Sequence, residues 1–133
     1  MVWYKFTRPD GTTVNGFRYP LPTPDGPGEW CEAPEPSKVP DGRDCGPGRL
    51  HFMKAPFSIY APWPYVCHEA EPGGLLVGES KEKAGWTRGR LLRTLTDTEL
   101  DHAIELELQN RFGMAGLYDC IAWVRLYQPF QQV

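Results

Sequence analysis

The sequence lacks the segments that would export a protein or hold it in a membrane. Its first residues, MVWYKFTRPDG, mix polar and aromatic side chains and contain no apolar core of the kind found in a signal peptide. No window approaches the roughly 18 consecutive apolar residues that are needed to cross a bilayer. We therefore expect a cytoplasmic protein with no membrane partner.

Closely spaced cysteines are also missing. The four cysteines are Cys31, Cys45, Cys67 and Cys120, and no two of them form a C-x-x-C pair. Structural zinc sites usually take their ligands in such pairs. Cys67 and His68 are adjacent, so in a strand they would point to opposite faces and could not share a metal. We expect no metal and no other cofactor, and reduced thiols rather than disulfides.

Sequence motifs that fix a reaction are absent. There is no G-x-S-x-G nucleophile elbow. The glycine-rich turn at residues 46–48 is not followed by the Lys-Ser/Thr of a P-loop. The net charge of -3 argues against a globally basic nucleic-acid binder. No stretch of the chain therefore demands a particular chemistry.

The composition predicts a folded α+β protein. A chain of 133 residues is the size of one domain, and it can bury roughly two-thirds of its unfolded surface. Hydrophobic residues make up 41%, while 14 Gly and 14 Pro indicate short strands joined by long connections. We expect a single compact, β-rich and loop-rich domain over residues 1–133, with one capped helix near the C-terminus and a final strand.

Strand signals dominate the first two-thirds of the chain. The strongest is a hairpin, in which residues 2–7 and 12–19 would pair across a turn at residues 8–11. Gly73-Gly74 predicts another turn, and Gly89 predicts a bulge. Further strands are expected at residues 30–32, 50–53, 58–60, 65–68, 75–77 and 86–95.

The helix signal is local and specific. Thr96 and Glu99 have the spacing of a capping box, and Leu100, Ile104 and Leu108 follow at every fourth position. The pattern predicts a helix over residues 97–112. A strand is the rival interpretation, because apolar and polar residues also alternate from Ile104. The last apolar run, residues 117–127, fits both, and the flanking Gly116 and Pro129 favour a strand.

One segment invites a catalytic interpretation. In a strand, Arg49 and His51 would share one face. His51 could then act as an acid, a base or a substrate donor at the edge of a pocket, while Arg49 held an anion beside it. The plainer alternative is a turn at residues 46–48 followed by a half-buried strand histidine.

A second segment, residues 81–93, invites a binding interpretation. Arginine together with tryptophan can anchor a protein interface or clamp single-stranded nucleic acid. The alternative is an ordinary edge strand whose charges discourage pairing with another sheet. An exposed aromatic ledge farther upstream could assist binding or cover the core. The candidates are Lys81, Lys83, Trp86, Arg88, Arg90 and Arg93, with Tyr60, Trp63 and Tyr65 as the ledge.

Several short motifs resemble a pattern found in small uncharacterised bacterial and phage proteins. The chain carries CGPGRLHFM, then YAPWP, then VGE followed by EK, and finally the arginine-rich RLLRTL. In those proteins a C-G-x-G-x-x-H segment, a G-E or G-D segment followed by lysines, and R-x-x-R-x-L recur in this order. The resemblance covers residues 30–95. It implies a bacterial or mobile-element origin, and it assigns no activity to any residue.

Three functions remain as hypotheses. The leading one is a non-catalytic accessory module that contacts another macromolecule, a protein before a nucleic acid, through residues 81–93. The second is a small nucleotide- or phosphate-handling enzyme with His51 and Arg49 in its pocket. The third is a single-stranded nucleic-acid binder that uses the same basic segment.

Overall fold

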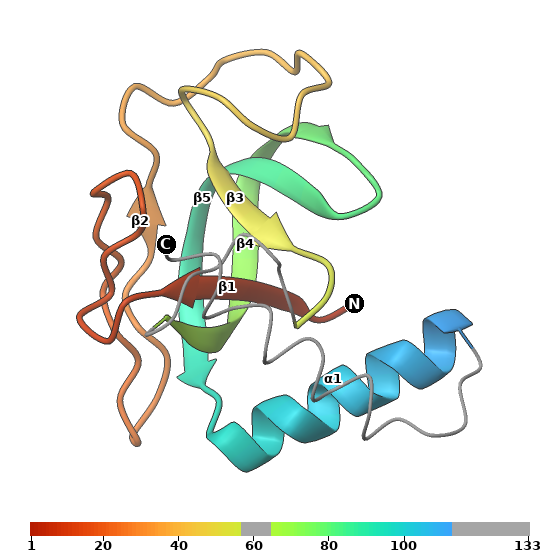
Figure 1. Cartoon of the computed structure of the whole chain (residues 1–133). Helices are drawn as coiled ribbons and strands as arrows, with labels where there is room; N and C mark the ends of the chain where they lie inside the picture. The colour runs from red at the N-terminus through yellow and green to blue at the C-terminus, as the bar shows by residue number, and fades with distance from the viewer. Residues whose placement is uncertain (57–64, 113–133) are drawn as a thin grey trace.

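A computed structural model describes residues 1–56 and 65–112 of the chain. It contains five antiparallel strands in one sheet and a single helix near the C-terminus (Figure 1). This is the α+β domain that the sequence predicts. The strands expected at residues 58–60 and 117–127 lie outside the described residues. The elements are β1 (Trp3–Thr7), β2 (Cys31–Glu32), β3 (Leu50–Met53), β4 (Val66–Glu79), β5 (Lys83–Thr94) and α1 (Asp97–Phe112).

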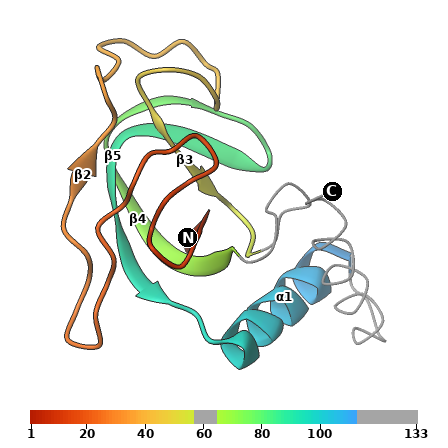
Figure 2. The same ribbon diagram turned by 60° about the vertical axis from the view of Figure 1, so that its left-hand side comes forward.

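The sheet closes on itself through its strand pairings. β5 pairs with β4 along one edge, and with β3 and then β2 along the other. β1 joins the free edges of β3 and β4, so that β1, β4, β5 and β3 form a ring. Three register shifts in the β4–β5 pairing let this long hairpin bend, and Figure 2 shows it curling round β1. Closure leaves few unpaired strand edges.

The core fills the inside of this curled sheet. Along β3, Leu50 and Phe52 are buried while His51 and Met53 are only half-buried, as the alternation of side chains in a strand predicts. Their apolar neighbours come from distant parts of the chain, including the proline-rich segment before β2. The buried cluster consists of Tyr19, Ala33, Leu50, Phe52, Ala70 and Leu91, with Trp3, Phe17, Cys31 and Trp86 packed against it.

The predicted N-terminal hairpin is wrong, although its turn forms. The amide of Gly11 donates to the carbonyl oxygen of Arg8 at 2.9 Å, which closes the expected turn. Residues 12–19 do not return along β1, because both of its edges are already taken by β3 and β4. They close on themselves instead, with a bridge between Thr12 and Arg18, and they deliver Tyr19 to the core.

Two glycine predictions are also wrong. Gly73 and Gly74 do not turn the chain: β4 runs through them, and Gly74, with φ of 71°, lies where the β4–β5 register shifts. Gly89 is not a bulge, because it pairs regularly with both Cys31 and Pro72. Its role is to leave space, since a Cβ there would lie 2.3 Å from Cζ of Phe52.

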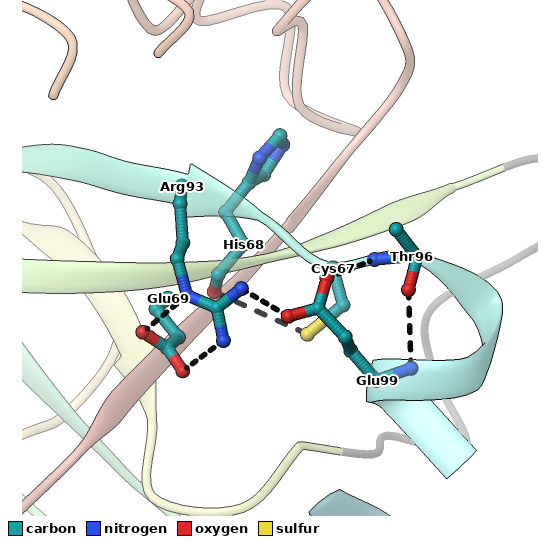
Figure 3. Close-up of polar contacts among 6 residues, drawn as sticks. All are labelled: Cys67, His68, Glu69, Arg93, Thr96 and Glu99. Atoms are coloured by element: carbon teal, nitrogen blue, oxygen red, sulfur yellow. Dashed lines mark hydrogen bonds and ion pairs between the residues drawn. The ribbon is translucent and has the colours of Figure 1, made fainter. Parts of the chain in front are cut away.

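The helix prediction is confirmed to its bounds. The amide of Glu99 donates to Oγ1 of Thr96 at 3.2 Å, and the amide of Thr96 donates to Oε1 of Glu99 at 3.1 Å (Figure 3). Ile104 and Leu108 are buried while Leu106 is 45% exposed, which is helical and not strand-like spacing. Within the described residues, no helix is long and apolar enough to cross a membrane.

Candidate functional site

Arg49, the predicted anion holder, is enclosed and already paired. Its side chain is 3% exposed, and its two terminal nitrogens lie 2.6 Å from the two carboxylate oxygens of Asp41. It also donates to the carbonyl oxygens of Pro47 and Arg43. Because its guanidinium group is occupied by these contacts, Arg49 is not free to bind a substrate anion. Its role is to hold the loop before β3 in shape. The same contact lowers the pKa of Asp41 far below its usual range.

His51 lies half-buried beside other basic groups. Burial, together with the smaller effect of the positive charges of Lys5 and Lys83, lowers its pKa to about 4. Nε2 of His51 is buried and has no hydrogen-bond partner among the described residues. Lys5 donates to the backbone carbonyl of His51 at 2.8 Å and is itself so enclosed that its pKa falls to about 8. At neutral pH His51 is therefore uncharged.

Two of the three arginines in residues 81–93 are neutralised by carboxylates. Arg90 donates to Oε1 of Glu71 at 2.7 Å. Arg93 donates hydrogen bonds to both carboxylate oxygens of Glu69, each at 3.1 Å, and it also pairs with Glu99 at the start of α1 (Figure 3). Arg93 thus fastens the helix to the sheet, and it does not face a partner as an unpaired charge.

The other members of this segment lie in different surroundings. Trp86 packs edge-on against Trp3 at a centroid distance of 6.5 Å and contacts the core, and its indole nitrogen is buried without a partner among the described residues. Lys83 directs its ammonium group to the sulfur of Cys45 at 3.7 Å, and Lys81 is exposed. The indole of Trp86 thus contacts Trp3 and the core.

A different tryptophan takes the position beside the arginines. Trp30, just before β2, is 38% exposed. The guanidinium carbons of Arg88 and Arg90 lie 4.4 Å and 4.9 Å from its ring centroid, within the range of cation–π contacts. Sequence reasoning missed Trp30 as a site residue. The sequence did contain a signal for an exposed Trp30, because this residue lies in a proline-rich loop next to a strand of only two residues.

Glycines make this arrangement possible. A Cβ on Gly73 would lie 3.0 Å from the ring of Trp30, and a Cβ on Gly74 would lie 3.0 Å from Cγ of Arg88. The side chains of Trp30 and Arg88 therefore pack directly against the backbone of β4 at these two glycines. We call this surface the Trp30 patch, and it consists of Trp30, Glu71, Gly73, Gly74, Arg88 and Arg90.

The aromatic ledge is only partly described. Tyr60 and Trp63 lie outside the described residues. Tyr65 is half-buried, its hydroxyl has no partner among the described residues, and the guanidinium of Arg8 lies 5.6 Å from its ring centroid. This contact ties the end of β1 to the start of β4, as expected for a residue that covers the core.

A groove of about 620 Å³ separates the N-terminus from α1. Its apolar walls include Val2, Leu95 and Leu106. Of the charged groups in its lining, Glu69 and Glu99 both pair with Arg93. The other polar side chains of the lining are Tyr4, Lys54, His102, Glu107 and Asn110.

Inside the sheet, His68 links three strands. Thr7 uses its hydroxyl proton to donate to the carbonyl oxygen of Arg8, so we assign the 2.7 Å contact with His68 to donation from Nε2. Nδ1 of His68 then accepts from the hydroxyl of Thr94 at 2.8 Å. Burial lowers the pKa of His68 to about 4. This neutral, satisfied histidine is a structural group.

The described part of the chain offers no group of three His, Cys, Asp or Glu side chains placed to hold a metal ion. Its three cysteines, Cys31, Cys45 and Cys67, are free thiols. Burial raises the pKa of Cys31 to about 11 and that of Cys67 still further, which suppresses the reactive thiolate in both.

Comparison of the chain with protein-family models, with curated proteins and with solved structures finds no match. The likeness to small bacterial and phage proteins therefore stays a prediction from sequence motifs. Function has to be argued from the residues themselves.

Proposed function

We propose that this domain is a non-catalytic module that binds another protein through the Trp30 patch. The observation that carries the proposal is an exposed indole in cation–π contact with two guanidinium groups, with Gly73 of β4 close to its ring. Tryptophan and arginine are the residues most enriched among those that dominate protein interfaces. An indole fixed by its neighbours also loses little conformational freedom on binding.

The charges around the patch favour a protein over a nucleic acid. Glu71 neutralises Arg90, and Glu32 is the register partner of Arg88 in the β2–β5 pairing. Nucleic-acid affinity depends on several unpaired cations that replace counterions along the phosphate backbone. A mixed surface with a central aromatic side chain is instead typical of protein contacts.

An enzymatic function receives less support. In that hypothesis Arg49 would hold the substrate anion, but its guanidinium group already donates to Asp41 and to two backbone carbonyls. His51 would then stand beside Lys5 and Lys83 without the anion-holding partner that the mechanism requires.

The test is affinity capture from a lysate of the native host with the immobilised domain. Trp30→Ala should reduce the recovery of specifically retained proteins by roughly tenfold or more. Val39→Ala is the matched control, because Val39 is 70% exposed and lies outside the patch. It should capture as the unmodified domain does. Circular dichroism verifies that both variants are folded. Equal recovery by the two variants, or no specific recovery at all, would contradict the proposal.

A further inference from the structure

Arg88 differs from the other arginines of β5 in having no carboxylate partner among the described residues. Arg90 pairs with Glu71, and Arg93 pairs with Glu69 and Glu99. Within residues 1–56 and 65–112, no carboxylate lies within ion-pair distance of Arg88, although Glu32 is its register neighbour. Its Nε is buried and has no hydrogen-bond partner in the same part of the chain.

The guanidinium group of Arg88 is nevertheless held in place. It stacks on Trp30 at 4.4 Å, and its aliphatic stem rests against the backbone of Gly74. A guanidinium group presents a planar fork of donors that matches a carboxylate bidentately. Because the stem and the plane are fixed before binding, little side-chain entropy remains to be lost when such a pair forms.

We infer that the Trp30 patch recognises an acidic peptide segment, in which an Asp or Glu carboxylate pairs with Arg88 while a neighbouring apolar side chain packs on Trp30. This inference rests on the proposed function and specifies the chemistry of its partner. A single carboxylate is enough to pair with Arg88, whereas a polyanion would also approach Glu71, which already pairs with the neighbouring Arg90.

Selection from a random peptide library displayed on phage tests this chemistry directly. The immobilised domain should enrich peptides with Asp or Glu next to Leu, Phe or another apolar residue. Clones selected on the unmodified domain should bind Trp30→Ala and Arg88→Gln at least about tenfold more weakly. Arg88→Lys should retain part of the binding, because it keeps the charge without the planar fork.

The outcomes separate this inference from the proposed function. Some selected peptides could require Trp30 but carry no acidic residue, or could bind Arg88→Gln as tightly as the unmodified domain. Either result would support the binding module but contradict the inference that a peptide carboxylate pairs with Arg88. Clones that bind Trp30→Ala as tightly as the unmodified domain, or no enrichment, would overturn both. An oligo-dT strand could also bind saturably, in a way that requires Trp30 and weakens steeply with salt. That result would identify a nucleic acid as the ligand of the patch and contradict the inference of an acidic peptide.

Discussion

The buried His68 should make this domain less stable in mild acid. Its pKa is about 4 in the folded protein, below the ordinary value of 6.5, because burial disfavours the charged imidazolium. The unfolded chain therefore binds a proton more readily than the folded one between these two values. The stability contributed by the neutral ring is fully present above pH of about 6.5 and is lost as the pH falls towards about 4.

The size of the effect follows from the pKa difference. Each pKa unit corresponds to about 1.4 kcal/mol, so the full loss approaches about 3.5 kcal/mol, of which about 2.5 kcal/mol is reached at pH of about 4.5. That is a large fraction of the 5–15 kcal/mol by which domains are ordinarily stable. The loss is expected because a protonated ring can no longer accept the hydrogen bond from Thr94.

Urea unfolding of the unmodified domain and of His68→Gln, measured between pH 7 and 4.5, isolates this contribution. A glutamine amide can donate to Thr7 and accept from Thr94 but does not titrate. All other titratable groups are common to the two proteins, so their effects cancel in the difference. The free-energy difference between the two proteins should therefore move by about 2.5 kcal/mol in favour of the variant.

A difference that stays constant over this range would refute the reasoning. Nuclear magnetic resonance gives an independent reading of the same group. The ring signals of His68 should remain in the neutral form down to pH of about 5, and a titration midpoint near 6.5 would show that the ring is not held as described.

Two further predictions concern the fold. Thr96→Ala should cost about 1 kcal/mol in urea unfolding because it removes the acceptor for the Glu99 amide, and an unchanged midpoint would mean that this cap does not stabilise α1. Gly89→Ala should cost about 1–3 kcal/mol because its Cβ would meet Phe52, whereas Gly26→Ala, which meets nothing within 4 Å, should be nearly neutral; equal midpoints for the two variants would contradict the packing argument.

The elements that local signals specify were predictable from the sequence. The capping box joins Thr96 and Glu99, three residues apart, so both of its hydrogen bonds form within one turn of chain. The strand expected at residues 50–53 also forms, as β3. The turn closed by Gly11 also forms where its residues indicate. In the capping box and the turn, the hydrogen-bond partners are neighbours along the chain, so the local sequence is enough to specify them.

Strand pairing and the candidate site depended on tertiary structure. The hairpin prediction failed because β3 and β4 occupy both edges of β1, and no local pattern reveals that competition. Arg93 looked like part of a basic surface until the fold brought Glu69, 24 positions away, to its guanidinium group.

The sequence predicted the wrong tryptophan beside the arginines for the same reason. Trp86 lies close to the arginines in sequence but packs against the core, while Trp30 reaches them because β2 pairs with β5. Composition and short-range pattern therefore determined the class of fold, the helix and most strand positions. Hydrogen bonding between distant strands decides which charges cancel. It also decides which indole is exposed beside an arginine that has no carboxylate partner in the described part of the chain.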